Sequence, residues 1–151
     1  MLTAAVKKLW QILPNGVRYR MVRITQPKFT ASAAAVILND KDQVLVLNHV
    51  LRPYSGWGLP GGFLDAGEQP RDAIRREIFE EVGIELNDLV MFRVRVVSRH
   101  IEMLFKARAV GEPAVKSREI TEVKWFAFDD LPADMSLAQK TIIARVLRDE
   151  V

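Results

Sequence analysis

The sequence predicts one α/β or α+β domain in which a mixed sheet packs between helices. Apolar runs with strand character lie on both sides of one acid-rich helical segment, and a second helical segment closes the chain. The length of 151 residues is ordinary for one domain and lets the chain bury about two-thirds of the surface that it exposes when unfolded. We therefore expect one folding unit that needs no metal ion to hold it together.

Residues 1–28 are expected to form an extension ahead of the globular domain, to which we assign residues 29–151. Residues 3–13 have helical periodicity and end before a proline, which indicates a short amphipathic helix. Its apolar positions are Val6, Leu9, Trp10 and Leu13. This helix is expected to pack on the domain or on a second subunit, which makes a homodimer a hypothesis. The less favoured alternative, which uses Lys7 and Lys8, is an interfacial membrane helix.

The predicted strands follow in chain order. Residues 18–26 are interpreted as an irregular strand, and residues 29–38 and 43–50 as a hairpin joined through the polar residues 39–42. Further strands are predicted over residues 89–97, 101–110 and 123–128. A turn at Leu131 and Pro132 precedes a closing helix over residues 136–147, with Ser136 as its N-cap.

Residues 52–58 are typical of a loop, and this loop leads into the paired glycines Gly61 and Gly62. Glycine lets the backbone come close to a ligand or an ion because no Cβ stands in the way. We expect this segment to border a binding site.

The helix over residues 70–82 carries the most informative pattern in the chain. Pro70 suits the first helical position, and Gly83 suits a left-handed end. The apolar residues that recur at i, i+4 and i+8 are expected to face the core. They are Ile74, Ile78 and Val82.

Three glutamates of this helix, Glu77, Glu80 and Glu81, fall together on another side. Neighbours three or four residues apart on a helix lie about 5–6 Å apart, so these charges repel one another. A divalent cation would turn the repulsion into binding, because Mg²⁺ prefers carboxylate oxygens together with waters and phosphate oxygens. The cluster thus predicts Mg²⁺ or Mn²⁺ and a phosphate ester or anhydride as substrate. The alternative is a solvated face with Asp72–Arg76 and Arg76–Glu80 pairs.

Residues 62–84, GFLDAGEQPRDAIRREIFEEVGI, resemble the signature of the Nudix hydrolases at every position of the motif. The matching residues are Gly62, Glu68, Arg76, Glu77, Ile78, Glu80, Glu81, Gly83 and Ile84. The resemblance implies a Nudix-like three-layer α/β/α sandwich with a mixed sheet. It extends by order of elements over residues 29–132, so the first 28 residues lie outside it.

The resemblance also implies roles for residues of the motif. Glu80 and Glu81 are the expected principal metal ligands, and the carbonyl of Gly61 is the expected backbone ligand. Glu77 is implied as a further ligand or as the base that orients water. Arg76 is expected to hold Glu77 or Glu80 through charge-assisted hydrogen bonds.

Two acids complete the expected site. Glu68 is expected to connect the loop to the start of the helix, where the helix dipole favours a carboxylate. Family members often place one more acid outside the motif, and our candidate for it is Glu119, with Glu112 and Glu102 as competitors.

Substrate contacts are harder to place from the sequence. The candidates for phosphate binding are Arg52, Lys106 and Arg118. The candidates for stacking on a base or sugar are Tyr54, Trp57 and Phe63, for which core packing is the competing role.

The resemblance implies a pyrophosphohydrolase that cleaves a nucleoside diphosphate linked to another moiety, such as a nucleotide sugar or ADP-ribose. The products would be a nucleoside monophosphate and a phosphorylated moiety. Two alternatives remain, namely a pyrophosphohydrolase of oxidised nucleoside triphosphates and a non-catalytic module that senses a nucleotide. Sequence markers of the ADP-ribose and dinucleoside polyphosphate subfamilies are absent around residues 99–101.

Composition excludes several classes of site. The chain has no cysteine, which removes disulfides, zinc thiolates and thiol catalysis and makes the cytoplasm the expected location. Its two histidines are too few for a histidine-rich metal site. The formal net charge of +3 is modest, and its basic residues are spread along the chain, so we expect neither a nucleic acid nor a membrane as partner.

Overall fold

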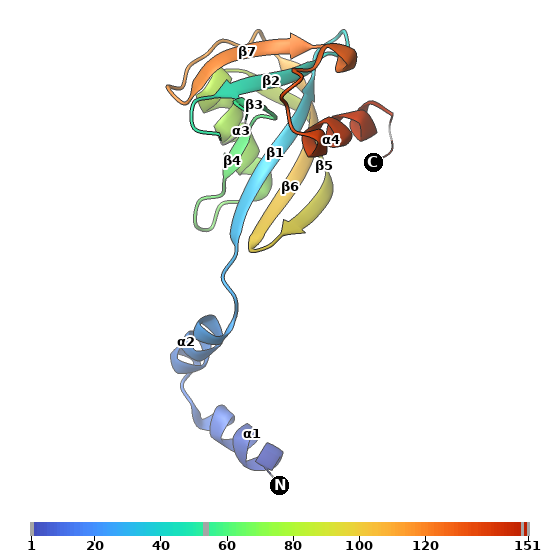
Figure 1. The fold of residues 1–151 in the computed structure, drawn as a ribbon. Coiled ribbons are helices and arrows are strands. Elements are labelled where there is room, and N and C mark those ends of the chain that lie inside the picture. The colour runs from blue at the N-terminus through green and yellow to red at the C-terminus, as the bar shows by residue number, and fades with distance from the viewer. Residues whose placement is uncertain (1, 53–54, 149, 151) are drawn as a thin grey trace.

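The computed structural model describes residues 2–52, 55–148 and 150, and its strands form a seven-stranded mixed sheet between helices (Figure 1). The main path runs β3-β2-β1-β6-β5, with β4 paired to β1 and β7 paired to β2. The strands are β1 (Thr30–Leu38), β2 (Val44–His49), β3 (Trp57–Gly58), β4 (Gly61–Phe63), β5 (Glu85–Val97), β6 (His100–Val110) and β7 (Ile120–Phe126). The predicted fold class is confirmed.

The centre of the sheet is β1, which pairs in parallel with β6 from Thr30–His100 to Leu38–Arg108. The predicted hairpin is confirmed only beside its turn, where Leu38 of β1 lies opposite Val44 of β2 in antiparallel register. Away from the turn, β1 pairs with β4 and β2 pairs with β7 and β3. The two strands of the predicted hairpin therefore pair mostly with other strands of the sheet and little with each other.

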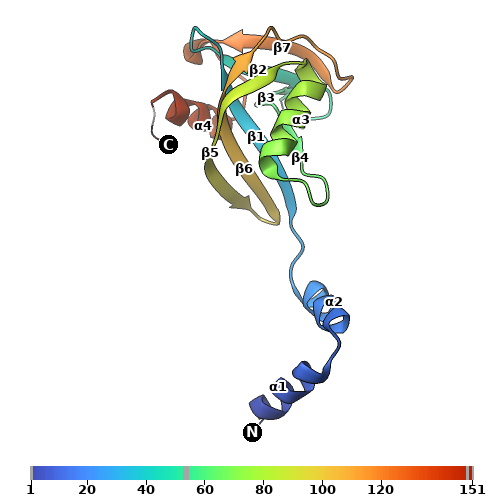
Figure 2. The ribbon, with the colours of Figure 1, turned by 180° about the vertical axis from the view of Figure 1, so that it is seen from behind.

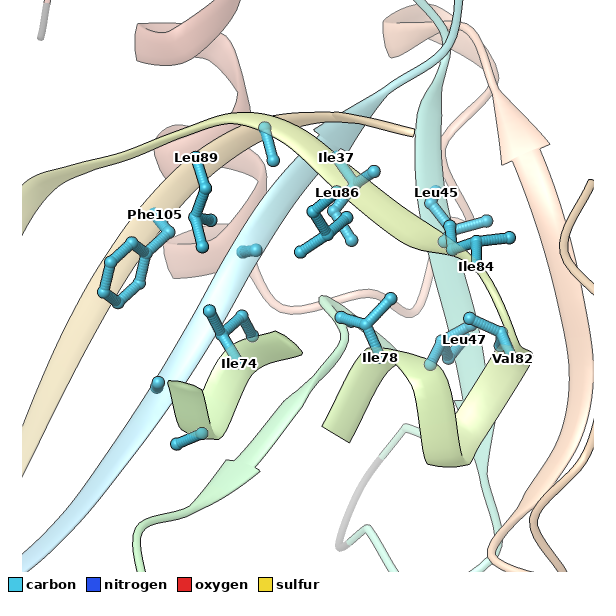
Figure 3. Packing of buried hydrophobic residues seen from close by; sticks show 14 of the residues in the cluster. Ile37, Leu45, Leu47, Ile74, Ile78, Val82, Ile84, Leu86, Leu89 and Phe105 are labelled. Atoms are coloured by element: carbon cyan, nitrogen blue, oxygen red, sulfur yellow. The ribbon is translucent and has the colours of Figure 1, made fainter. Parts of the chain in front are cut away.

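Helix α3 (Pro70–Val82) covers one face of the sheet (Figure 2). Pro70 starts it, and Gly83 ends it with φ 73°, as the sequence predicts. Its buried residues Ile74, Ile78 and Val82 pack on the sheet in the first core cluster. Figure 3 shows these side chains directed at Ile37, Leu45, Leu47 and the start of β5. The small residues Ala33 and Ala35 of β1 belong to this cluster and leave room for the helix.

Helix α4 (Leu137–Leu147) covers the other face of the sheet (Figure 1). Successive side chains of β1 point to opposite faces, so Val36 packs in the core on this side while its neighbours Ala35 and Ile37 pack in the core on the α3 side. Ser136 accepts a hydrogen bond from the backbone N–H of Gln139, so the predicted cap is confirmed. The helix contributes Ile142, Ile143 and Val146 to the second core cluster. Two cores on two sheet faces make three layers.

The structure corrects the prediction for residues 18–26. They belong to α2 (Asn15–Thr25) instead of an irregular strand. The β-branched and aromatic residues of this segment suggested a strand, but its helix starts on the carbonyl of Pro14, which accepts from the N–H groups of Val17 and Arg18. Within the described residues the segment pairs with no strand, and local helical hydrogen bonds satisfy its backbone.

Helix α1 (Leu2–Ile12) agrees with the predicted amphipathic helix. Both views show α1 and α2 standing away from the sheet, joined to β1 by an extended segment (Figures 1 and 2). No residue of α2 is buried. The expected packing of the first helix on the domain is therefore not seen. No helix of the described residues is both long and apolar enough to cross a membrane.

Candidate active site

A cavity of about 480 Å³ lies where the start of β1, β4, the acidic face of α3 and the first turn of α4 meet. It collects residues that are far apart in the sequence. The polar and charged side chains that line it are Ser32, His49, Arg52, Asp65, Arg76, Glu77, Glu81, Glu102, Glu119 and Gln139. The glycines Gly61 and Gly62 line it as well.

The two glycines of β4 allow the strand to lie between β1 and the acids of α3. A Cβ on Gly61 would stand 2.2 Å from the carbonyl oxygen of Ala33, and φ at Gly61 is 142°. A Cβ on Gly62 would stand 2.3 Å from Cδ and from Oε1 of Glu77. The carboxylate of Glu77 therefore rests directly against the backbone of β4, a position that any larger residue at 62 would fill.

Arg76 connects the loop before α3 to the acids on the helix. Its Nε and Nη2 donate to Glu68 at 2.8 and 2.9 Å, and its Nη1 donates to Oε1 of Glu77 at 2.9 Å and to Oε2 of Glu80 at 3.4 Å. Glu68 in turn accepts from the backbone N–H of Asp65 at 2.9 Å. These bonds lower the pKa of Glu68 to about 2, so it stays charged and keeps Arg76 in place.

Glu81 is the buried acid of the site, with 6% of its surface exposed. Burial, and next the negative charge of Glu77, raise its pKa to about 7, while a hydrogen bond from the backbone of Gly61 opposes this rise. Among the residues that the structure describes, its Oε2 has no hydrogen-bond partner. Burial also raises the pKa of Glu77. Two neighbouring carboxylates in a poorly hydrated place are costly unless a cation or protons neutralise them.

His49 and Arg52 approach the same carboxylate from the other side. Nδ1 of His49 lies 3.8 Å from Oε1 of Glu81, and burial, and next the charge of Arg52, lower the pKa of His49 to about 4. Nη2 of Arg52 donates to the carbonyl of Leu59 at 2.8 Å, and burial lowers its pKa. Nη1 of Arg52 and Nε2 of His49 have no hydrogen-bond partner in the described structure.

Four polar residues line the cavity although no sequence pattern marks them, namely Ser32, His49, Asp65 and Gln139. His49 ends an apolar strand, and no spacing to the glutamates marks it as part of the site. Gln139 comes from the first turn of α4, where its Oε1 accepts from the N–H of Leu59 at 3.2 Å. His49 and Gln139 enter only because the fold brings the end of β2 to α3 and the first turn of α4 to Leu59.

Some of the other predicted residues line the cavity, and others lie outside it. Glu119 and its competitor Glu102 line the cavity, and Glu119 adds to the rise in the pKa of Glu81. Glu102 is paired with Arg95. Glu112, the other candidate for the acid outside the motif, lines a different hollow beside Trp125. Glu80 is 60% exposed at its side chain and is not among the residues that line the cavity.

Lys106 lies on another part of the surface, in a hollow with Leu38 and Val146, and Arg118 is not among the cavity residues. Tyr54 lies outside the described residues. Among the aromatic candidates, Trp57 packs edge-on against Phe126 within the second core cluster.

Phe63 is the aromatic residue of β4 that lines the cavity, and 63% of its surface is exposed. Its ring meets the ring of His100 edge-on, with 5.7 Å between the two ring centroids. His100 is itself held between the hydroxyls of Thr30 and Ser32, each 2.8 Å from a ring nitrogen. The phenyl ring is thus both fixed and accessible.

The donors of the cavity fit a hard divalent cation. In the described part of the chain, no group of three or more acidic or histidine side chains is arranged to hold a metal ion. Mg²⁺ needs fewer, since it usually takes one or two carboxylates and completes its shell with waters and phosphate oxygens. The buried, unpartnered Oε2 of Glu81 beside Glu77 is such a donor set.

A mixed sheet between helices, with a glycine strand facing a glutamate-rich helix, defines the class of hydrolases whose signature residues 62–84 resemble. The family model described as NUDIX domain matches residues 28–146, and the chain belongs to this family. Nudix hydrolases act on phosphorus-containing acid anhydrides.

Relatives and solved structures agree with this membership. A MutT-like protein of Streptomyces ambofaciens is 28% identical over 113 residues, which cover 73% of this chain and 71% of the relative. The NAD-capped RNA hydrolase NudC of Salmonella paratyphi C is 28% identical over 148 residues, 96% of this chain. The chain spans 55% of that relative. The crystal structure of a MutT NUDIX hydrolase from Burkholderia pseudomallei aligns with a TM-score of 0.70 and 29% identity, covering 80% of this chain and 99% of that one.

Proposed function

We propose that this protein is a Mg²⁺- or Mn²⁺-dependent pyrophosphohydrolase that cleaves the phosphoanhydride bond of a nucleoside diphosphate linked to another moiety. The proposed products are a nucleoside monophosphate and the phosphorylated moiety. Family membership supports the reaction class. The NudC relatives, which are named for the hydrolysis of NAD-capped RNA, support a substrate in which a diphosphate links a nucleoside to a second group.

The observation that carries the proposal is the state of Glu81. An acid that is 6% exposed, with one oxygen unpartnered and a second carboxylate beside it, is unfavourable for folding. Sites of this kind occur where a ligand supplies the missing charge. The family's divalent cation meets that requirement.

We assign the cation to the carboxylates of Glu77 and Glu81, with Glu80 and the carbonyl of Gly61 as further donors and Glu119 as the acid from outside the motif. The bound cation would supply positive charge that polarises phosphoryl oxygens and favours attack by water. Arg76 holds the carboxylate of Glu77 in the direction of the cavity, so that Glu77 can serve as a ligand or as the base for water.

Arg52 is the proposed contact for the substrate's phosphates. The bond from its Nη2 to the carbonyl of Leu59 fixes the guanidinium, and the unpartnered Nη1 remains for a phosphate oxygen. Phe63 offers an exposed ring at the cavity for a base or sugar. Lys106, Arg118 and Tyr54 stay predictions without a place in the described cavity.

Two other functions remain as alternatives. A pyrophosphohydrolase of oxidised nucleoside triphosphates would use the same acids of α3. A sensor that binds a nucleotide without cleaving it would use the same cavity, although the presence of every acid of the signature favours catalysis. A cytoplasmic location is part of the proposal and depends on the absence of cysteine from the chain.

A substrate panel with Mg²⁺ and with Mn²⁺ tests the proposal. It contains ADP-ribose, nucleotide sugars, NAD, dinucleoside polyphosphates and oxidised nucleoside triphosphates. We expect release of a nucleoside monophosphate from one diphosphate-linked compound and a fall in kcat of about 10³-fold or more in Glu81→Gln. The matched control is Glu112→Gln, which removes an exposed acid from outside the cavity.

The outcomes separate the three functions. Pyrophosphate release from a triphosphate would move the assignment to the second function, and binding without turnover would move it to the sensor. Full activity of Glu81→Gln in the presence of metal would refute the assignment of that ligand.

A further inference from the structure

The charges of this chain are unevenly divided between its two parts. Residues 1–28 hold six of the 22 basic residues and none of the 19 acidic ones. Residues 29–151 therefore carry sixteen basic and nineteen acidic residues, so a cationic segment is attached to a slightly anionic domain. We call residues 2–28 the arm. A segment with this charge attracts an anionic partner.

The first helix of the arm separates apolar from polar side chains. Val6 and Leu9 follow at i and i+3 and share one face of the helix, and Lys8 lies on the other face. Lys7 lines a shallow hollow together with Val6 and Trp10, at the border between the two faces. The apolar face is uncovered in the structure, with Val6 58% and Leu9 64% exposed. Trp10 borders this face and is 38% exposed.

The second helix carries further basic and exposed apolar side chains, without the same division into two faces. It has no acidic residue, and its basic residues are Arg18, Arg20 and Arg23. Large apolar side chains remain exposed along it, among them Met21 at 46% and Ile24 at 76%. Figures 1 and 2 show both helices before the start of β1 and clear of the sheet. The arm thus presents apolar and cationic groups together to its surroundings.

From the sequence we expect no membrane as partner, because the basic residues are spread along the chain, but it is the absence of acidic residues that makes the arm cationic. We propose that the arm binds an anionic lipid surface, with the apolar face of α1 inserted at the level of the headgroups and the basic side chains against the lipid phosphates. Such a surface covers both kinds of group at once. A nucleic acid would neutralise the cations but would leave the apolar face in water. Paired arms of two copies would bury the apolar faces but would bring two sets of cations together without an acidic residue between them.

The proposal does not depend on the substrate of the cavity. The arm places the domain at a surface, and the acidic cavity remains open because none of its residues belongs to the arm. Loss of membrane binding should therefore leave hydrolysis of soluble substrates unchanged.

Co-sedimentation of the full chain with vesicles tests the proposal. One set of vesicles is pure phosphatidylcholine, and the other is an equal mixture of phosphatidylcholine and phosphatidylglycerol. We expect binding to the mixed vesicles only, weakened by salt. One basic residue near an anionic surface corresponds to about fivefold in partitioning, so Lys7→Gln/Lys8→Gln should bind about 30-fold more weakly.

Two further variants separate charge from apolar insertion. Lys41→Gln/Lys140→Gln removes the same charge from the domain and should bind like the unmodified protein. Leu9→Gln keeps all cations, removes an exposed apolar side chain and should weaken binding. Circular dichroism of each variant checks that the domain is still folded.

Several results would overturn the proposal. Equal binding to both kinds of vesicle, or to neither, would do so. A dimer mass in light scattering that Leu9→Gln abolishes would assign the apolar face to a second copy of the chain. Binding to a single-stranded RNA oligonucleotide that Lys7→Gln/Lys8→Gln weakens, without any binding to the mixed vesicles, would assign the arm to nucleic acid.

Discussion

Replacement of Glu81 by Gln is expected to stabilise the metal-free protein at alkaline pH even though it disables the proposed site. The carboxyl group is 6% exposed, and burial together with the charge of Glu77 raises its pKa from 4.5 to about 7. Glutamine keeps the shape of the side chain and removes the charge. The variant therefore isolates the energetic cost of the buried anion.

The sign follows from the direction of the pKa shift. Between pH 4.5 and 7 the folded protein binds the proton of Glu81 more tightly than the unfolded chain does, so wild-type stability falls as pH rises through this window. At 1.36 kcal/mol per pKa unit, the shift corresponds to about 3 kcal/mol above pH 7. The charged neighbours Glu77, Arg52 and Glu119 and the neutral His49 remain in both proteins and largely cancel in the comparison.

Urea unfolding with a chelator present, at pH 5 and at pH 8, measures the effect. The unfolding free energy of Glu81→Gln should exceed that of wild type by up to about 3 kcal/mol at pH 8 and by little at pH 5. Adding Mg²⁺ at pH 8 should stabilise wild type more than the variant, because the ion binds the folded state. Glu112→Gln is the control. The same difference at both pH values, or a less stable variant at pH 8, would refute the reasoning.

Three further predictions concern packing and substrate binding. Gly62→Ala should lower kcat by about 10²-fold because its Cβ would displace the carboxylate of Glu77, and steady-state kinetics on the substrate from the panel measures this. Arg52→Lys should raise KM about 10–100-fold, since an ammonium group cannot bond the carbonyl of Leu59 and a phosphate in the same geometry. Ile78→Ala should cost about 2–5 kcal/mol in urea unfolding, because it empties part of the core beneath α3.

Each of these variants has a control. Gly16→Ala adds a methyl group where nothing lies within 4 Å, so normal kinetics there and in Gly62→Ala would contradict the displacement of Glu77. Arg118→Lys changes a basic residue outside the cavity, and an equal rise in KM would contradict a specific role for Arg52. Phe79→Ala shortens the exposed neighbour of Ile78, and an equal loss of stability would contradict the core argument.

Helix α3 shows why some helices can be predicted from the sequence. Its proline start, glycine end and apolar spacing are local signals, and each depends on residues within two or three turns. Local signals failed for residues 18–26, where strand-forming residues form α2. Strand formation requires a partner edge, and no sequence window contains information about whether one is within reach.

The pairing of strands is the part that the sequence does not reveal. The β1–β2 hairpin was expected to be a complete unit, but β1 pairs over its whole length with β6, which follows it by about 60 residues. That pairing brings Glu102 to the cavity and carries Lys106 to another part of the surface. Glu102 lies opposite Ser32, which lines the cavity, whereas Lys106 lies opposite Val36, four residues farther along the strand.

The sequence by itself determined the acid-rich helix, the glycines before it and the Nudix class, because these depend on spacing within 23 consecutive residues, 62–84. Only the tertiary structure decided that Glu81 is buried, without a partner among the described residues for one oxygen, and that His49 and Arg52 lie near it. It also decided that Gln139 accepts a hydrogen bond from Leu59 just before β4. Burial and pKa depend on what the rest of the chain packs against a side chain, and that becomes defined only when distant strands and helices come together.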